Sequence, residues 1–186
     1  MPQQALFLDR DGIINVDKHY VSDPTDFEWM PGIFALAAAA HDLGALLIVV
    51  TNQSGIARGL YTEEKYQTLT AWMRARFERE GVPLAHVYHC PYLKGGDGED
   101  HPLRKPNPGM LLAAQQDFDL DMSRCAMLGD KWTDMDAARA AGVGHAAIVG
   151  DARLQANEAT LRPEVALLND LSAATRWLEK TLRTAP

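Results

Sequence analysis

The chain has 186 residues, of which 47% are apolar and 23% charged, and its formal net charge is −7 at pH 7. This length supplies one sizeable hydrophobic core, so we expect a single domain over residues 1–186. The acidic balance argues against a surface built to bind nucleic acid or an anionic membrane. No apolar stretch approaches the ~18 residues of a membrane span, and the N-terminus carries no signal-peptide pattern.

The two cysteines, Cys90 and Cys125, provide no disulfide framework. Together with the absence of a leader pattern, this predicts a reduced protein of the cytoplasm. We expect a monomer whose partner is a small molecule.

Short apolar runs alternate with amphipathic stretches along the chain. Ala45–Val50 is continuously apolar, as expected of a central parallel strand that is buried on both faces. Acids follow Thr62, and Asn107 precedes a proline, so a helix start is predicted at each place. In chain order the patterns predict strand 5–8, helix 33–43, strand 45–50, helix 62–80, strand 86–90, helix 108–118, strand 125–128, helix 133–141, strands 145–149 and 165–168, and helix 171–182.

This alternation predicts a three-layer, Rossmann-like α/β domain with a mainly parallel central sheet. Ligands of such sheets bind beyond the carboxyl ends of the strands. Polar segments lie at predicted strand ends or helix starts, at 9–12 (DRDG), 51–55 (TNQSG), 104–108 (RKPNP) and 129–134 (GDKWTD).

These segments hold the groups that breaking a P–O bond requires. Asp9 and Asp11 supply a nucleophilic carboxylate and a proton-transfer carboxylate. Thr51 and the backbone N–H groups after it form an anion cradle, Lys105 adds a cation, and Asp130 is an acid suited to a metal. Each segment alone also suits an ordinary turn or helix cap. Their joint occurrence indicates a phosphoryl-transfer site.

The four segments resemble the four motifs of the haloacid dehalogenase (HAD) superfamily of phosphatases. The longer strings FLDRDGIINVD, VVTNQSGIARG and RKPNPGMLL are similar, more narrowly, to the branch that holds the heptose-bisphosphate and histidinol-phosphate phosphatases. The similarity runs from about residue 5 to 150. It implies a Mg²⁺-dependent phosphatase of a phosphorylated sugar, in which Asp9 forms an aspartyl-phosphate and Asp11 is general acid and base.

The resemblance also implies roles for further residues. Mg²⁺ is expected on the Asp9 carboxylate, the Asp11 backbone carbonyl and Asp130, and Asp134 is expected to orient Lys105 or a metal-bound water. The residues implied in binding the substrate and its phosphate are Asp17, Lys18, His19, Tyr20, Thr51, Asn52, Gln53, Ser54, Arg104 and Lys105.

Two features distinguish the chain within this resemblance. The zinc loop common in the branch has its four ligand positions at Cys90, Tyr92, His101 and Leu103 here, and structural zinc requires four ligands, so zinc is not expected. The intervals between the first three motifs already hold a helix and a strand each. They leave no room for the cap domain that many superfamily members insert there, so an open site is expected.

Other functions compete with the bisphosphate. Histidinol phosphate carries an ammonium and would favour carboxylates, whereas Arg104, Lys18 and Arg58 favour a second phosphate. A polynucleotide 3′-phosphatase uses related motifs, but the net charge of −7 speaks against it. A phospho-acceptor signalling module also pairs a strand-end aspartate with a lysine and Mg²⁺, yet it has no need of an acid–base group such as Asp11.

Overall fold

A computed structural model describes residues 2–93, 95, 101–150 and 164–183 of the chain. Six strands form one sheet in the order β3-β2-β1-β4-β5-β6, and each pair of neighbours runs parallel. The elements are β1 (Ala5–Leu8), α1 (Ile33–Asp42), β2 (Leu46–Asn52), α2 (Glu63–Arg79), β3 (Leu84–Cys90), α3 (Gly109–Phe118), the 3₁₀-helix η2 (Met122–Arg124), β4 (Ala126–Gly129), α4 (Trp132–Ala140), β5 (His145–Val149), β6 (Val165–Leu168) and α5 (Leu171–Arg183).

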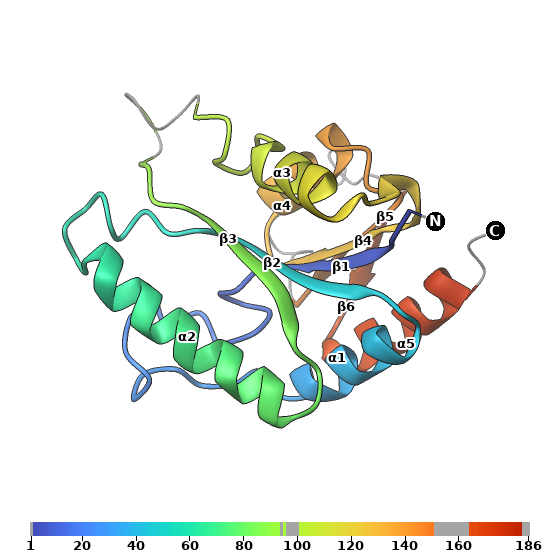
Figure 1. The fold of residues 1–186 in the computed structure, drawn as a ribbon, viewed down its shortest axis with the longest axis horizontal. Helices are drawn as coiled ribbons and strands as arrows, with labels where there is room; N and C mark the ends of the chain where they lie inside the picture. The colour runs from blue at the N-terminus through green and yellow to red at the C-terminus, as the bar shows by residue number, and fades with distance from the viewer. Residues whose placement is uncertain (1, 94, 96–100, 151–163, 184–186) are drawn as a thin grey trace.

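Helices cover both faces of the sheet, which gives three layers (Figure 1). Helices α1, α2 and α5 pack on one face, and α3 and α4 pack on the other. Side chains of β1 alternate between the two faces of the sheet. Leu6 and Leu8 pack in the core beneath α1, α2 and α5, whereas Ala5 and Phe7 pack in the core beneath α3 and α4, so both faces are apolar. The predicted three-layer α/β class is confirmed.

The structure corrects some predicted boundaries. β2 continues through Asn52 and β3 begins at Leu84, so both strands are longer than their most apolar parts. Asn107 does not cap α3, which begins at Gly109. The Asn107 side chain instead donates to the carbonyl of His101 (3.0 Å), which ties the preceding loop together.

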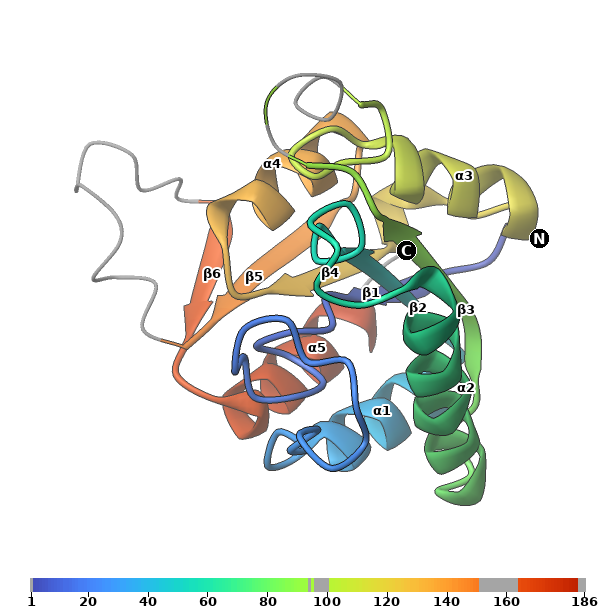
Figure 2. The same ribbon diagram turned by 90° about the vertical axis from the view of Figure 1, so that its left-hand side faces the viewer.

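The strand order places the site. After β3 the chain crosses back and adds β4 on the other side of β1, so β1 lies at the point where the direction of winding changes. The loops that leave β1, β2 and β4 therefore meet at one edge of the sheet (Figure 2). Gly12 lets the loop after β1 approach the loop after β4 closely, because a Cβ there would lie 2.6 Å from Cγ of Asp130 and its φ is +90°.

Residues 5–90 are described throughout, and between the first three strands they form only α1, α2 and connecting loops. The long loop 9–32 folds against the sheet through backbone hydrogen bonds such as Met30 N–H to the Ile14 carbonyl (2.9 Å). This agrees with the expected lack of an inserted cap. Among the described helices, none combines the length and the apolar character that crossing a bilayer requires.

Candidate active site

A buried lysine joins the carboxylate of Asp9, which follows β1, to that of Asp134 in the first turn of α4. Nζ of Lys105 lies 3.0 Å from Oδ1 of Asp9 and 2.7 Å from Oδ1 of Asp134, and it donates to the Val50 carbonyl at 2.7 Å. Burial alone would lower the pKa of Lys105, but the charges of Asp134 and Asp9 outweigh it and raise that pKa. Lys105 is therefore a fixed cation at the end of β2. Its contact with Asp134 agrees with the orienting role expected of that carboxylate.

Asp9 follows β1 and is the most perturbed acid of this group. Burial raises its pKa to about 7, opposed by Lys105 and reinforced by Asp134 and Asp130. Its contacts among the described residues fall on Oδ1, which accepts from the Arg10 backbone N–H (2.7 Å) and from Lys105. This leaves Oδ2 as the oxygen suited to attack an electrophile.

A cation fits between the carboxylates of Asp9, Asp130 and Asp134. One oxygen of each lies within 4.8 Å of the others. Oδ1 of Asp130 is buried and has no hydrogen-bond partner among the described residues, and burial raises the pKa of Asp130 to about 6. The three carboxylates outnumber the two lysines that contact them, Lys105 and Lys131, and carboxylate oxygens are the ligands that Mg²⁺ prefers.

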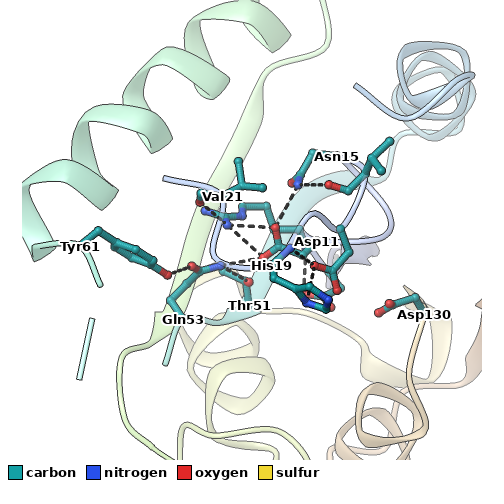
Figure 3. A network of polar contacts seen from close by, with 12 residues as sticks. Asp11, Asn15, His19, Val21, Thr51, Gln53, Tyr61 and Asp130 are labelled. Carbon is teal, nitrogen blue, oxygen red and sulfur yellow. Dashed lines mark hydrogen bonds and ion pairs between the residues drawn. The ribbon is translucent and has the colours of Figure 1, made fainter. Parts of the chain in front are cut away.

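The Asp11 carboxylate faces the Gln53 side chain beside Thr51 and lies apart from Asp130 (Figure 3). Both of its oxygens accept from Nη2 of Arg10 at 3.0 Å. Oδ1 also accepts from Nδ2 of Asn15 (3.0 Å), and Oδ2 accepts from Nε2 of Gln53 (3.1 Å). The Asp11 side chain is thus outside the three-carboxylate cluster, and its predicted metal contact concerns the backbone carbonyl.

Arg10 and Asn15 are two partners that sequence reasoning did not single out. Arg10 is 1% exposed, and its Nη2 also donates to the Val21 carbonyl (2.9 Å). The guanidinium therefore joins Asp11 to the middle of the loop 9–32. The signal in the sequence was weak, because an arginine between two aspartates is normally taken as solvated.

The end of β2 and the loop that follows it supply the predicted hydroxyl and amides, with one difference. Thr51 is 1% exposed, and its Oγ1 accepts from Nε2 of Gln53 at 2.9 Å. The Asn52 side chain exchanges two hydrogen bonds with the Lys105 backbone (3.0 and 3.1 Å), so it joins two loops instead of pointing freely at a ligand. Ser54 lines the hollow beside them.

Two adjoining pockets open beside these groups. The first is lined by Asp11, Asp17, His19, Tyr20, Asn52, Gln53, Ser54, Tyr61 and Lys131. The second is lined by Asn52, Ser54, Arg104, Lys105, Pro106, Lys131 and Thr133. Lys18 lines neither pocket, and its ammonium instead pairs with Glu28 at 2.8 Å. The other predicted substrate residues of the loop 9–32 do lie in the first pocket.

Lys131 is the cation that sequence reasoning missed. Its Nζ lies 3.2 Å from Oδ2 of Asp17 and 3.4 Å from Oδ2 of Asp130, and it lines both pockets. Asp17 is held further by the His19 backbone N–H (3.0 Å), and this N–H and Lys131 outweigh burial to lower the pKa of Asp17. The available signal was the position of Lys131 directly after Asp130.

The described part of the loop after β3 is held by its own contacts. The rings of Tyr92 and His101 stack with centroids 3.8 Å apart, and Nδ1 of His101 accepts from the Leu103 N–H (3.2 Å). Nη1 of Arg104 donates to the Tyr92 carbonyl (2.8 Å), which holds the guanidinium of this pocket-lining residue. In the described part of the chain, neither Cys90 nor His101 belongs to a group of three potential metal ligands.

The sequence is similar to those of known proteins. Residues 102–174 match a family model described as HAD-hydrolase-like. A D-glycero-alpha-D-manno-heptose-1,7-bisphosphate 7-phosphatase of Burkholderia mallei is 49% identical over 155 residues, which are 81% of this chain and 82% of that protein. The D-glycero-beta-D-manno-heptose-1,7-bisphosphate 7-phosphatase of Vibrio cholerae is 49% identical over 148 residues, covering 77% and 80% of the two chains.

A solved structure is similar over nearly the whole chain. The D,D-heptose 1,7-bisphosphate phosphatase of B. bronchiseptica, complexed with magnesium and phosphate, has a TM-score of 0.84 and 27% identity. The match covers 96% of this chain and 99% of that one. This structure and the two relatives together establish the family of the chain. The acids around a buried lysine are consistent with it. The chain belongs to the heptose-1,7-bisphosphate 7-phosphatase family of HAD-like phosphatases, which are phosphoric monoester hydrolases.

Proposed function

We propose that this chain removes the 7-phosphate of D-glycero-D-manno-heptose 1,7-bisphosphate with Mg²⁺ and through an aspartyl-phosphate on Asp9. The names of the relatives support the substrate. The observation that carries the chemistry is the buried Asp9, whose Oδ1 is bound to Lys105 while Asp11 lies two residues further on at the pocket. A nucleophile, a cation and a proton-transfer group meet there at one sheet edge.

In the first step, Oδ2 of Asp9 attacks phosphorus and the sugar oxygen leaves. Lys105 lies beside Asp9, and the Thr51 hydroxyl lies beside Gln53 of the first pocket. Both stabilise the negative charge that shifts among the phosphoryl oxygens in the transition state. Asp11 donates a proton to the leaving oxygen. Its ionised form then accepts a proton from the water that hydrolyses the aspartyl-phosphate. The free enzyme is regained with both carboxylates in their starting states.

Asp9, Asp130 and the Asp11 backbone carbonyl would hold Mg²⁺, which when bound supplies positive charge to offset the repulsion between nucleophile and substrate. Asp134 holds Lys105 rather than the metal, because its Oδ1 lies 2.7 Å from Nζ of Lys105. Its Oδ2 accepts from the Lys131 backbone N–H (3.1 Å), which fixes the start of α4.

The metal requirement gives a first prediction. EDTA should abolish turnover, Mg²⁺ should restore it, and more Mg²⁺ should be needed at pH 6 than at pH 8. The reason is that burial raises the pKa of Asp9 to about 7 and that of Asp130 to about 6, so below these values protons compete with the metal. The half-saturating Mg²⁺ concentration, from activity titrations at fixed ionic strength, should rise by up to about tenfold per pH unit on acidification below 7.

A zinc-selective chelator is the control for this prediction. Because Tyr92 and Leu103 replace ligands of the zinc loop, the chelator should leave activity and the thermal midpoint unchanged. Stoichiometric zinc by elemental analysis would contradict this view of the loop. A half-saturating Mg²⁺ concentration that stays constant from pH 6 to 8 would contradict the assigned ligands.

The second pocket suggests how the bisphosphate is selected. Arg104 and Lys131 line it, adjacent to the reacting end of the site. Cations at this place suit the phosphate that does not react, and guanidinium binds phosphate in a bidentate manner. We expect Arg104→Ala to lower kcat/KM for the bisphosphate by about 1–3 kcal/mol, roughly 5–150-fold, with little change for p-nitrophenyl phosphate. Steady-state kinetics with both substrates measures the difference.

Two matched variants make this comparison specific. Arg79→Ala removes an exposed arginine from the end of α2 and should change neither substrate. Lys18→Ala should have a smaller effect than Arg104→Ala, because Lys18 pairs with Glu28 outside the pockets. An equal loss for both substrates in Arg104→Ala, or a higher kcat/KM for histidinol phosphate than for the bisphosphate, would remove the assigned substrate.

The comparisons give no support to the histidinol-phosphate or phospho-acceptor alternatives. The B. mallei relative is named for the α-anomer and the V. cholerae relative for the β-anomer, and each is 49% identical to this chain. Kinetics with each anomer of the bisphosphate therefore decides the anomer. The proposal also includes a single domain, a monomer and a cytoplasmic location. Light scattering of the purified protein tests the monomer.

A further inference from the structure

Tyr61 touches the site without belonging to any of its four motifs. Its side chain is 7% exposed, and its hydroxyl donates to Oε1 of Gln53 at 2.6 Å (Figure 3). Burial raises the pKa of Tyr61 to about 12, so the hydroxyl keeps its proton near neutral pH. The hydroxyl is thus a lasting donor to the Gln53 amide oxygen.

This contact determines which way the Gln53 amide faces. With Oε1 turned to Tyr61, the NH₂ group faces both Oδ2 of Asp11 (3.1 Å) and Oγ1 of Thr51 (2.9 Å). Since Thr51 accepts this hydrogen bond, its own hydroxyl proton is available to donate to a phosphoryl oxygen. A flipped amide would set Oε1 against the Asp11 carboxylate and would draw the Thr51 proton away from the substrate.

The local fold brings Tyr61 back onto the loop that follows β2. The Leu60 N–H donates to the Gly55 carbonyl at 2.9 Å, which closes this loop. A Cβ at Gly55 would lie 2.3 Å from Cε1 of Tyr61, so the ring lies directly on the glycine. Only a residue without a side chain at position 55 lets the hydroxyl reach Gln53.

We propose that Tyr61 is a positioning residue for phosphoryl transfer, which orients the Gln53 amide so that the Asp11 carboxylate and the Thr51 hydroxyl are held in their working directions. This inference rests on the proposed phosphatase function. It adds a residue that acts through Gln53 and does not touch the substrate phosphate. Its effect therefore falls on the reacting end, which distinguishes it from Arg104.

The first test is Tyr61→Phe, which removes one oxygen. We expect kcat to fall about tenfold with both the heptose bisphosphate and p-nitrophenyl phosphate, the scale of losing one orienting hydrogen bond. KM should stay within about twofold, because the oxygen that is removed is engaged with Gln53 and the ring that lines the first pocket remains. Tyr88→Phe is the matched control, since its hydroxyl bonds Asp117 away from both pockets. It should leave kcat unchanged.

A double variant tests whether Tyr61 acts through Gln53. Gln53→Ala and the pair Gln53→Ala/Tyr61→Phe should have the same kcat, because the second change has no amide left to orient. In NMR spectra, the side-chain NH₂ signals of Gln53, identified by their loss in Gln53→Ala, should move in Tyr61→Phe and stay in Tyr88→Phe. Gly55→Ala, which displaces the ring but keeps the hydroxyl, should reproduce the kinetic loss if Tyr61→Phe folds poorly.

A kcat of Tyr61→Phe within twofold of wild type, multiplicative losses in the double variant, or unmoved Gln53 signals would each overturn the inference. These outcomes are separate from failure of the proposed function. If the wild type hydrolyses p-nitrophenyl phosphate but not the bisphosphate, the substrate is wrong and the kinetic test of Tyr61 still holds. If it hydrolyses neither, the NMR comparison alone decides whether Tyr61 orients Gln53.

Discussion

Replacing Asp9 with asparagine is expected to abolish turnover of every phosphate ester, because no other group at the site is placed to form the covalent intermediate. The amide is nearly isosteric, but it is a poor nucleophile and cannot form an acyl phosphate. Lys105 keeps its contacts with Asp134 (2.7 Å) and the Val50 carbonyl (2.7 Å), so the fold should persist. Phosphate release and the thermal midpoint are measured together.

Asp42→Asn is a matched control for this variant. Asp42 is exposed at the end of α1, before β2 begins, and so lies away from the carboxyl ends of the strands. Its replacement should leave kcat unchanged. Mass spectrometry of acid-quenched enzyme should find a phosphoryl group on wild type and none on Asp9→Asn. Near-normal steady-state turnover by purified Asp9→Asn would remove the covalent mechanism.

Replacing Asp11 with asparagine is expected to lower kcat by roughly 10²–10⁴, the usual contribution of general acid–base catalysis. The loss should be largest in the hydrolysis of the intermediate, because the amide cannot accept a proton from water. The variant should therefore accumulate phosphoenzyme with p-nitrophenyl phosphate, whose leaving group needs little protonation. Rapid-quench measurement of phosphoenzyme against time tests this directly.

The loss of kcat in Asp11→Asn could also come from a disturbed fold, and the contacts of Asp11 allow this explanation to be tested. Its carboxylate accepts from Arg10, Asn15 and Gln53, and an asparagine retains one of the two accepting oxygens. A thermal midpoint near that of wild type would show that the loss is chemical. Unchanged kcat, with no accumulation of phosphoenzyme, would assign proton transfer to another group.

The two variants together also separate an enzyme from a phospho-acceptor module. A signalling module needs no acid–base group beside its acceptor aspartate, so Asp11→Asn would not alter the lifetime of its phosphorylated form. In the proposed phosphatase the same change prolongs that lifetime. The comparison uses Asp9 and Asp11 alone and does not depend on which sugar is the substrate.

Much of the fold could be predicted because the strands are apolar on both faces. Ala5–Leu8, His145–Val149 and Val165–Leu168 match the predicted strands residue for residue. Two of the errors in the predicted boundaries involve polar side chains. β2 includes Thr51 and Asn52, which hydrophobicity alone assigns to a loop. α3 begins after Asn107, because that side chain bonds the His101 carbonyl instead of capping the helix.

The sequence by itself predicted most chemical groups of the candidate site, though not Lys131, because the acids, hydroxyl and lysine lie within short motifs next to strand ends. It could not determine their pairing, since hydrogen bonds between loops depend on the order of strands in the sheet. Lys18 and Lys131 illustrate this: one pairs with Glu28 outside the pockets, whereas the other contacts Asp17 across 114 positions and lines both. Only the tertiary structure joined Lys131 to Asp17, Asn52 to Lys105, and Tyr61 to Gln53. Lys131 meets Asp17 because β1 and β4 are neighbours and the loops that leave them lie side by side. Asn52 meets Lys105 because β2 and β3 are neighbours, whereas Tyr61 reaches Gln53 because the loop after β2 folds back on itself.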